Sequence, residues 1–192
     1  RFVIHYDMPK SLEGYYQETG RAGRDGGEGQ CICYYAQEDI ERLRRFQQGK
    51  TPKEIGIGNQ LLFETQSYAE STICRRKLLL HYFGEEYTEE KCGNCDNCRK
   101  SYKQVDASEL LQLILETIQQ VNEKHKAEHI VDILHGNQTA EVMSYHHDEL
   151  ENFGAASDEE ESTLHAIIRQ ALVVGMLKKD VDSYGDLKLT KD

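Results

Sequence analysis

The sequence predicts an α+β, multidomain chain in three parts: the edge of an α/β sheet, a cysteine-containing helical segment, and a helical region that ends in a β-hairpin. Strand and helix patterns alternate over the first fifty residues, which is typical of an α/β layer. A long helical pattern then leads into a cysteine cluster, and two short alternating runs around a glycine turn close the chain. We expect the three parts to cover residues 1–50, 51–104 and 105–192.

The first part is expected to contain two strands and two helices. The apolar run at its start is typical of a strand that is buried on both faces. In chain order, the predicted elements are this strand at 2–6, a helix at 12–19 capped by Ser11, a glycine loop at 24–29, a strand at 30–36 and a helix at 38–48. Cys31 and Cys33 have no partner at a C-x2-C spacing, so we expect two free, buried thiols in the second strand.

The rest of the chain is expected to be mainly helical. In chain order we expect a linker at 51–58, a helix at 59–83 that bends near residues 71–72, an amphipathic helix after a capping pair at Asp106 and Glu109, helices at 126–135, 139–152 and 158–174, and a terminal hairpin. Helices followed by a hairpin in fewer than ninety residues suggest a winged helix.

The strongest chemical signal is a set of four cysteines. Cys92, Cys95 and Cys98 follow one another at two C-x2-C spacings, and Cys74 lies 18 residues upstream on the predicted helix. Four thiolates with no open position are typical of structural zinc rather than catalytic zinc. Because such an ion orders a segment with little core of its own, we expect metal binding and stability to be coupled.

Three alternatives to zinc stay open for these cysteines at the level of sequence. Disulfides are disfavoured because the chain opens without a secretory signal, and C-x2-C runs in an intracellular chain favour a metal. An iron–sulfur cluster uses a similar run, although the C-x3-C-P continuation of bacterial ferredoxins is missing, and chance spacing is the third alternative. His81 could replace one thiolate, but a surface histidine is the simpler interpretation. No cysteine or acid cluster supports His146 and His147 as metal ligands.

A second signal is the run GYYQETGRAGRDGG. Gln17, Arg21 and Arg24 are four and three residues apart, so on a helix they point in one direction. Glycines between them remove side-chain bulk, and two neighbouring guanidinium groups suit a polyphosphate, where an arginine finger promotes phosphoryl transfer. On spacing alone, surface arginines paired with Glu18 and Asp25 are the better interpretation.

Charge and hydropathy narrow the possible functions. The chain carries 23 basic and 34 acidic residues, a formal net charge of -11, and its mean hydropathy is -0.70. Residues 1–100 are nearly neutral, with 15 basic and 16 acidic residues, whereas 101–192 carry 8 and 18. A protein that binds nucleic acid over its whole surface should be basic, and this chain is acidic. Any contacts to phosphate must therefore come from local clusters of basic residues. The longest apolar run is too short for a transmembrane helix, so we expect no membrane partner.

The motifs together resemble those of a known family. QETGRAGRDG resembles the sixth helicase motif of the RecQ family of superfamily-two DNA helicases, and FVIHYDMPKSLEGYYQE is similar to the strand and helix before it. CRRKLLLHYFGE followed by CGNCDNC resembles the RecQ zinc-binding segment, and the region after residue 105 takes the place of the RecQ winged helix. The resemblance implies the C-terminal part of an ATP-dependent, 3′-to-5′ DNA helicase that acts in replication, recombination and repair.

The resemblance also implies roles for individual residues. In such helicases two RecA-like lobes clamp ATP, and the final motif reaches across from the second lobe. Arg24 is then the finger on the γ-phosphate, Arg21 supports the same polyphosphate, and Gln17 couples it to the bound strand. The four cysteines match the ligands of one structural zinc ion, and the winged helix is expected to bind duplex or forked DNA. The residues expected to contact DNA are Arg169, Lys178, Lys179, Tyr184 and Lys188.

Several parts of such a helicase have no match in this sequence. The phosphate loop, the Walker-B motif and the Asp-Glu-x-His box are missing, so ATP and Mg²⁺ are expected only in a longer parent that supplies the first lobe and the rest of the second in cis. We expect the chain alone neither to hydrolyse ATP nor to unwind DNA, and we expect the parent in a bacterial-type cytoplasm, associated with the nucleoid. The rival hypotheses are an acidic winged-helix and zinc module that binds a basic protein, and an iron–sulfur redox protein.

Overall fold

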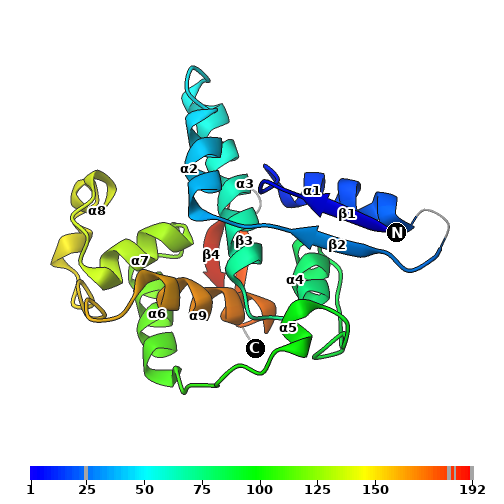
Figure 1. The fold of residues 1–192 in the computed structure, drawn as a ribbon. Coiled ribbons are helices and arrows are strands. Elements are labelled where there is room, and N and C mark those ends of the chain that lie inside the picture. The colour runs from blue at the N-terminus through cyan, green and yellow to red at the C-terminus, as the bar shows by residue number, and fades with distance from the viewer. Residues whose placement is uncertain (24–25, 181–182, 184, 191–192) are drawn as a thin grey trace. The chain divides into compact units, whose positions relative to one another are not determined.

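The chain forms two compact units in the computed structural model, Arg1–Arg99 and Lys100–Asp192. The structure describes residues 1–23, 26–180, 183 and 185–190. The first unit contains a parallel pair of strands and the second an antiparallel pair, and helices make up most of the rest (Figure 1). This mixture confirms the expected α+β class. None of the helices in the described part combines the length and apolarity needed to span a bilayer.

The first unit begins with a strand–helix–strand motif, as predicted. Its elements in chain order are β1 (Phe2–His5), α1 (Leu12–Thr19), the 3-10 turn η1 (Gly20–Gly23), β2 (Gln30–Cys33), α2 (Gln37–Arg45), α3 (Pro52–Glu70), α4 (Arg75–Tyr82) and α5 (Asp96–Arg99). The strands β1 and β2 pair in parallel, with Phe2 opposite Gln30. The predicted cap of α1 is confirmed, because the Ser11 hydroxyl accepts a hydrogen bond from the backbone N–H of Gly14 at 3.2 Å.

The prediction that the first strand is buried on both faces is wrong. Phe2 and Ile4 expose 69% and 52% of their surface. The reason is that the described part of this sheet has two strands, so it offers these side chains few neighbours. The prediction of two buried thiols also needs correction: both thiols are free, but Cys31 is exposed and Cys33 is half-buried.

Aromatic side chains hold α1 against the helices that follow. The rings of Tyr15 on α1 and Tyr68 on α3 lie 5.5 Å apart between centroids. The Tyr82 hydroxyl on α4 donates a hydrogen bond to Glu13 Oε1 at 2.7 Å. These contacts connect the segment that carries Gln17 to the helices that flank the cysteine cluster.

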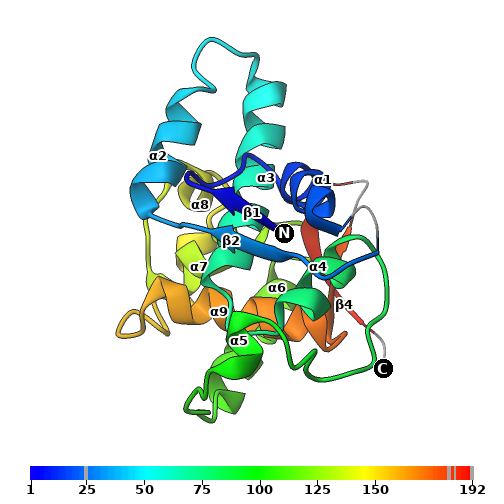
Figure 2. The ribbon, with the colours of Figure 1, turned by 45° about the vertical axis from the view of Figure 1, so that its right-hand side comes forward.

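Residues 51–58, which are expected from the sequence to form a linker, are the start of α3 instead. The Thr51 hydroxyl accepts a hydrogen bond from the Glu54 N–H, and the Glu54 carboxylate accepts one from the Thr51 N–H at 2.9 Å. This is a complete capping box, with a proline in the first helical turn. Gly58, within this helix, leaves room for the amide group of buried Gln47, which would lie too close to a Cβ at this position. The helices α2 and α3 thus form a hairpin (Figure 2).

The helix predicted at 59–83 is two helices, and the bend predicted near 71–72 is confirmed as the break between them. α3 ends at Glu70 and α4 begins at Arg75. In the break, the Ser71 hydroxyl accepts a hydrogen bond from the Ile73 N–H at 3.0 Å, which satisfies one backbone donor outside the helices. The break leaves Cys74 as the N-cap residue of α4.

In the second unit two helices pack against a terminal hairpin, and a third helix packs on both of them. Its elements in chain order are α6 (Ser108–Gln120), α7 (Ala127–His135), α8 (Ala140–Ser144), the 3-10 turn η2 (His147–Glu149), α9 (Glu161–Val173), β3 (Leu177–Asp180) and β4 (Asp186–Leu189). The predicted helices at 126–135 and 158–174 and the terminal hairpin are confirmed within a few residues. The core is made of fully buried aliphatic side chains, namely Ile114, Ile118, Ile130, Ile133, Leu134, Leu164 and Leu187.

The prediction of one helix over 139–152 is wrong. The helix α8 ends at Ser144, and His146 adopts a left-handed backbone conformation with φ of 57° before the short turn η2. A non-glycine residue with positive φ is uncommon and cannot continue a right-handed helix. The chain therefore reverses at His146 and brings His147 back toward α7.

Candidate functional site

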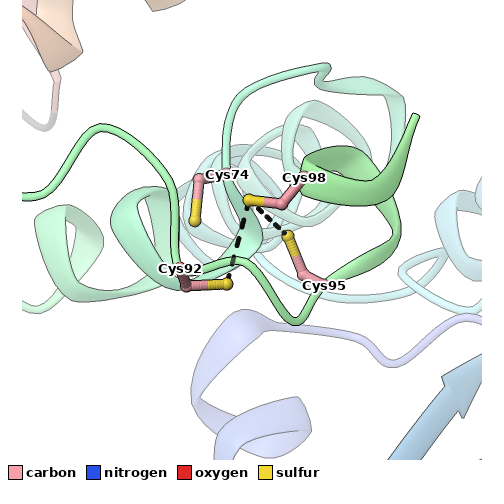
Figure 3. A group of neighbouring side chains, drawn as sticks. All are labelled: Cys74, Cys92, Cys95 and Cys98. Carbon is pink, nitrogen blue, oxygen red and sulfur yellow. Dashed lines mark hydrogen bonds between the residues drawn. The ribbon is translucent and has the colours of Figure 1, made fainter. Parts of the chain in front are cut away.

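Four cysteine side chains converge in the first unit (Figure 3). Cys74 comes from the break before α4, Cys92 and Cys95 from the loop before α5, and Cys98 from α5 itself. One sulfur atom from each residue lies within 4.8 Å of the other three, and Cys74 is the most buried of the four. The fold thus joins residues that are up to 24 positions apart into the ligand set named from the sequence.

The separations of these sulfur atoms fit a single metal ion. Cys98 Sγ lies 3.4 Å from Cys95 Sγ and 3.9 Å from Cys92 Sγ. Thiolates around a tetrahedral zinc ion are about 3.8 Å apart, as the Zn–S length of about 2.3 Å requires. All six cysteines are free, and an iron–sulfur cluster would hold the four thiolates farther apart because its own atoms stand between them. The cluster therefore suits one structural zinc ion, and His81 is not part of it.

Hydrogen bonds favour ionisation at one of these thiols. Burial opposes ionisation of Cys92, but hydrogen bonds from the backbone of Asn94 and Cys95 lower the pKa of its thiol to about 6. Burial and the hydrogen bond with Cys95 raise the pKa of Cys98. Zinc binds thiolates, so a bound ion replaces the thiol protons that remain.

Two further residues hold the cysteine segments together, and neither is assigned a role from the sequence. The Arg75 guanidinium makes two hydrogen bonds of 3.0 Å to the Asp96 carboxylate. The backbone N–H of Arg75 donates a hydrogen bond to Cys95 Sγ at 3.4 Å. The buried Asn97 amide donates to the carbonyl oxygens of Ser71 and Ile73 at 2.6 and 2.7 Å. Their positions in the sequence could have pointed to them, because each residue is adjacent to a cysteine of the cluster.

The glycine–arginine segment lies at the end of α1. Gln17 is on α1 and Arg21 is on η1, and both side chains are exposed. Arg24 lies outside the described residues. Ala22 is buried, and the backbone of Gly29 lies so close that a Cβ there would be 2.7 Å from the Ala22 Cβ. This contact anchors η1 on its buried side and leaves Arg21 on its solvent side.

One alternative for these arginines is weakened by the structure. The Glu18 carboxylate accepts a hydrogen bond from His5 Nε2 at 2.6 Å. Among the described residues, no ion pair joins Glu18 to Arg21. A simple surface pairing of these two side chains therefore does not account for the arginine.

The hairpin places its lysines in different surroundings. Lys178 and Lys188 lie directly opposite each other across the two strands, whereas Lys179 is on the face of the hairpin that carries buried Leu177. Lys178 is exposed, and the Lys188 ammonium donates to the backbone oxygen of Glu123. Arg169 on α9 is half-buried, and Tyr184 lies outside the described residues. Among the four of these five residues that the structure describes, Lys178 is the most exposed.

The second unit holds a further cluster that the sequence motifs do not reveal. His125, His129 and His147 each place a ring nitrogen within 4.8 Å of the others. Burial, followed by the neighbouring His125 and His147, lowers the pKa of His129 to about 4. The signal that could have found it is the H-x3-H spacing of the first two histidines. The sequence pairs His146 with His147, but His146 is exposed and points toward Glu149, with 3.9 Å between His146 Nδ1 and Glu149 Oε1.

Comparisons with known proteins agree with this arrangement. A four-thiolate centre that suits structural zinc, followed along the chain by a helical unit that ends in a hairpin, defines the class of protein. Two family models match the chain in succession. The RecQ zinc-binding model matches residues 37–99, and the RQC domain model matches residues 101–192.

Longer proteins that match this chain are also RecQ helicases by name. The whole chain aligns at 32% identity with the ATP-dependent DNA helicase RecQ of Pasteurella multocida and with that of Haemophilus influenzae, covering 30% and 31% of those proteins. A RecQ-like DNA helicase of Caenorhabditis elegans is 44% identical over 122 residues, which are 59% of this chain and 12% of that protein. The chain belongs to the RecQ family. It spans about a third or less of the length of these relatives.

Proposed function

We propose that this chain is the C-terminal part of an ATP-dependent, 3′-to-5′ RecQ-type DNA helicase that acts in replication, recombination and repair. The observation that carries this proposal is the four-thiolate centre, which lies inside the region matched by the RecQ zinc-binding model and directly before the RQC match. In this proposal residues 1–50 belong to the second RecA-like lobe, 51–104 form the zinc-binding subdomain, and 105–192 form a winged helix. The role places the parent in the bacterial cytoplasm, at the nucleoid.

The first segment is proposed to complete an ATP site together with parts of the helicase outside this sequence. Gln17 and Arg21 are exposed at the end of α1, where they are accessible to a nucleotide held by another lobe, and Arg24 is proposed to act beside them. Phe2 and Ile4 are exposed on β1, which suits further strands and helices packing there. ATP and Mg²⁺ belong to that longer protein, because this sequence has no phosphate loop, and the chain alone is proposed to be inactive.

The second unit is proposed to bind duplex or forked DNA through its hairpin and α9. Lys178 and Lys188 face each other across the strands, and like charges in this position are unfavourable unless an anion lies near both. A phosphate group is such an anion. Asp180 and Asp186 share this face, and Lys188 Nζ lies 3.9 Å from Asp180 Oδ2, so the positive charge is local and the binding is expected to be weak and sensitive to salt.

Replacing Lys178 with glutamine is expected to weaken binding of a labelled forked duplex several-fold at low salt. The loss of one phosphate contact should also reduce the slope of log affinity against log salt by about one. Fluorescence anisotropy at low and moderate salt measures both quantities. The matched control is Lys103→Gln, which makes the same charge change at an exposed lysine before α6 and is expected to leave binding unchanged.

A second function, a module that binds a basic protein, is favoured by one observation. Residues 101–192 carry 8 basic and 18 acidic residues, which is unusual for a DNA-binding unit. The same titration decides between the two functions. If the unmodified chain does not bind the duplex even at low salt, the DNA proposal is wrong and the protein-binding alternative is preferred.

A further inference from the structure

The histidine cluster of the second unit joins three segments of the chain. His125 lies in the turn before α7, His129 lies on α7, and His147 begins η2. His129 is 4% exposed and His125 is 9% exposed, so two of the three rings are buried. Their rings stack with centroids 4.0 Å apart, and the ring of His147 meets them edge-on at 5.0 and 5.1 Å.

The polar atoms of this cluster are poorly satisfied as it stands. His129 Nε2 and His147 Nδ1 are 2.8 Å apart and share one hydrogen bond. The other ring nitrogen of His129, Nδ1, is buried and has no hydrogen-bond partner in the part of the chain that the structure describes. A buried polar atom without a partner is destabilising, and stacking of the rings does not give that atom a partner.

A carboxylate lies on the same side as these nitrogens. Glu141 Oε1 is 3.6 Å from His125 Nδ1 and 3.8 Å from His129 Nδ1. Both distances are too long for hydrogen bonds, yet the same carboxylate oxygen lies within 4 Å of a ring nitrogen of each of these two histidines. Three imidazoles with a neighbouring carboxylate are a donor set that suits a first-row divalent transition ion such as Zn²⁺.

The backbone is shaped to bring the three rings together. Asn122 and Glu123, in the turn before His125, have φ of 58° and 56°, and His146 has φ of 57° directly before His147. Left-handed conformations at non-glycine residues are unfavourable and persist where the surrounding structure requires them. Here these left-handed residues lie in the turn before His125 and in the turn before His147, the two turns that lead into the cluster.

We propose that His125, His129 and His147 form a second metal site, independent of the cysteine centre, that binds Zn²⁺ with Glu141 beside it. Ligand nitrogens around a tetrahedral zinc ion are about 3.3 Å apart, and small rotations of the imidazole rings bring nitrogens now within 4.8 Å of one another to that spacing. The ion satisfies the buried His129 Nδ1 and cross-links η2 to α7. Its role is to fix the segment between α7 and α9.

The test is a zinc titration of the full chain with the cysteine centre already loaded. Native mass spectrometry should show two zinc ions per chain in excess Zn²⁺, and the second ion should raise the melting temperature. His147→Ala is expected to lower the affinity for the second ion by more than about tenfold while the first ion is retained. His147 is half-buried on a short turn, which makes this substitution the one least harmful to the fold.

The matched control is His146→Ala, which removes the exposed neighbouring histidine and should leave both ions in place. A second variant, His125→Asn, should also lose only the second ion. Co²⁺ added to the zinc-loaded chain should give an absorption spectrum without sulfur-to-metal charge-transfer bands, because its ligands are nitrogen and oxygen. Binding of a single zinc ion in excess zinc overturns the proposal, and so does a second ion that His147→Ala leaves unaffected.

Discussion

Replacing Cys95 with serine is expected to remove the zinc ion and unfold the segment between α3 and α5. Serine is close to cysteine in size, so packing changes little, but a neutral hydroxyl replaces a thiolate that lies 3.4 Å from Cys98 Sγ. Structural zinc sites contribute about 10–16 kcal/mol of apparent binding free energy, which is comparable to or larger than the total stability of about 5–15 kcal/mol of an ordinary domain. The loss should therefore appear as missing metal and as a melting temperature lowered by more than about 10 °C.

The measurement combines zinc content by elemental analysis with thermal melting by circular dichroism. Cys31→Ser is the matched control, because this exposed thiol lies on β2 and outside the cluster, so zinc content and melting should stay unchanged. Removing zinc from the unmodified chain with a chelator should reproduce the melting loss of Cys95→Ser. A Cys95→Ser chain that keeps as many zinc ions as the unmodified chain and melts normally would contradict the metal assignment.

The sequence predicts the metal centre well because its signal is local. Two C-x2-C spacings force Cys92, Cys95 and Cys98 to within a short loop, and chemistry then requires one further ligand. The break before Cys74 is also predictable, since polar residues interrupt an apolar helical pattern there. What the sequence does not show is the set of long-range hydrogen bonds that fix the loop, because the carbonyl partners of Asn97 lie 24 and 26 residues away.

The errors in the predicted elements have identifiable causes. A linker is predicted at 51–58 because Gly56 and Gly58 disfavour helices, although the capping box of Thr51 and Glu54 is visible in the sequence. The helix predicted at 139–152 is interrupted at His146, whose left-handed backbone no local pattern indicates. At 51–58 the local capping box thus outweighs the low helix preference of two glycines.

The histidine cluster shows how a site is missed when its residues come from separate segments. His125 and His129 have the i, i+4 spacing of a metal-binding pair, but the third histidine is 18 positions further along. Its position depends on the reversal at His146, which a continuous helix over 139–152 excludes. An error in one element therefore removes a candidate site from consideration.

Replacing Asn97 with aspartate is expected to weaken zinc binding although all four cysteines remain. The buried Asn97 amide donates to the carbonyl oxygens of Ser71 and Ile73, which lie directly before Cys74. A carboxylate of the same shape has no hydrogen to donate and opposes two carbonyl oxygens with negative charge. A carbonyl that is left buried and unpaired costs about 1–3 kcal/mol, and a disturbed partner of a ligand segment lowers metal affinity about 10–100-fold.

The matched control for this change lies in the same loop. Asn94 is exposed, and its Oδ1 accepts a hydrogen bond from Arg99 at 2.9 Å, so Asn94→Asp makes the same charge change but keeps its acceptor. Competition with a chromophoric chelator measures the zinc affinity of both variants, and thermal melting measures their stability. Because the Asn97 amide binds backbone carbonyls rather than a sulfur atom, a selective loss of affinity in Asn97→Asp identifies it as a positioning residue that holds Cys74 in reach of the loop. Equal affinity in the two variants would mean that the zinc ion alone draws Cys74 into place.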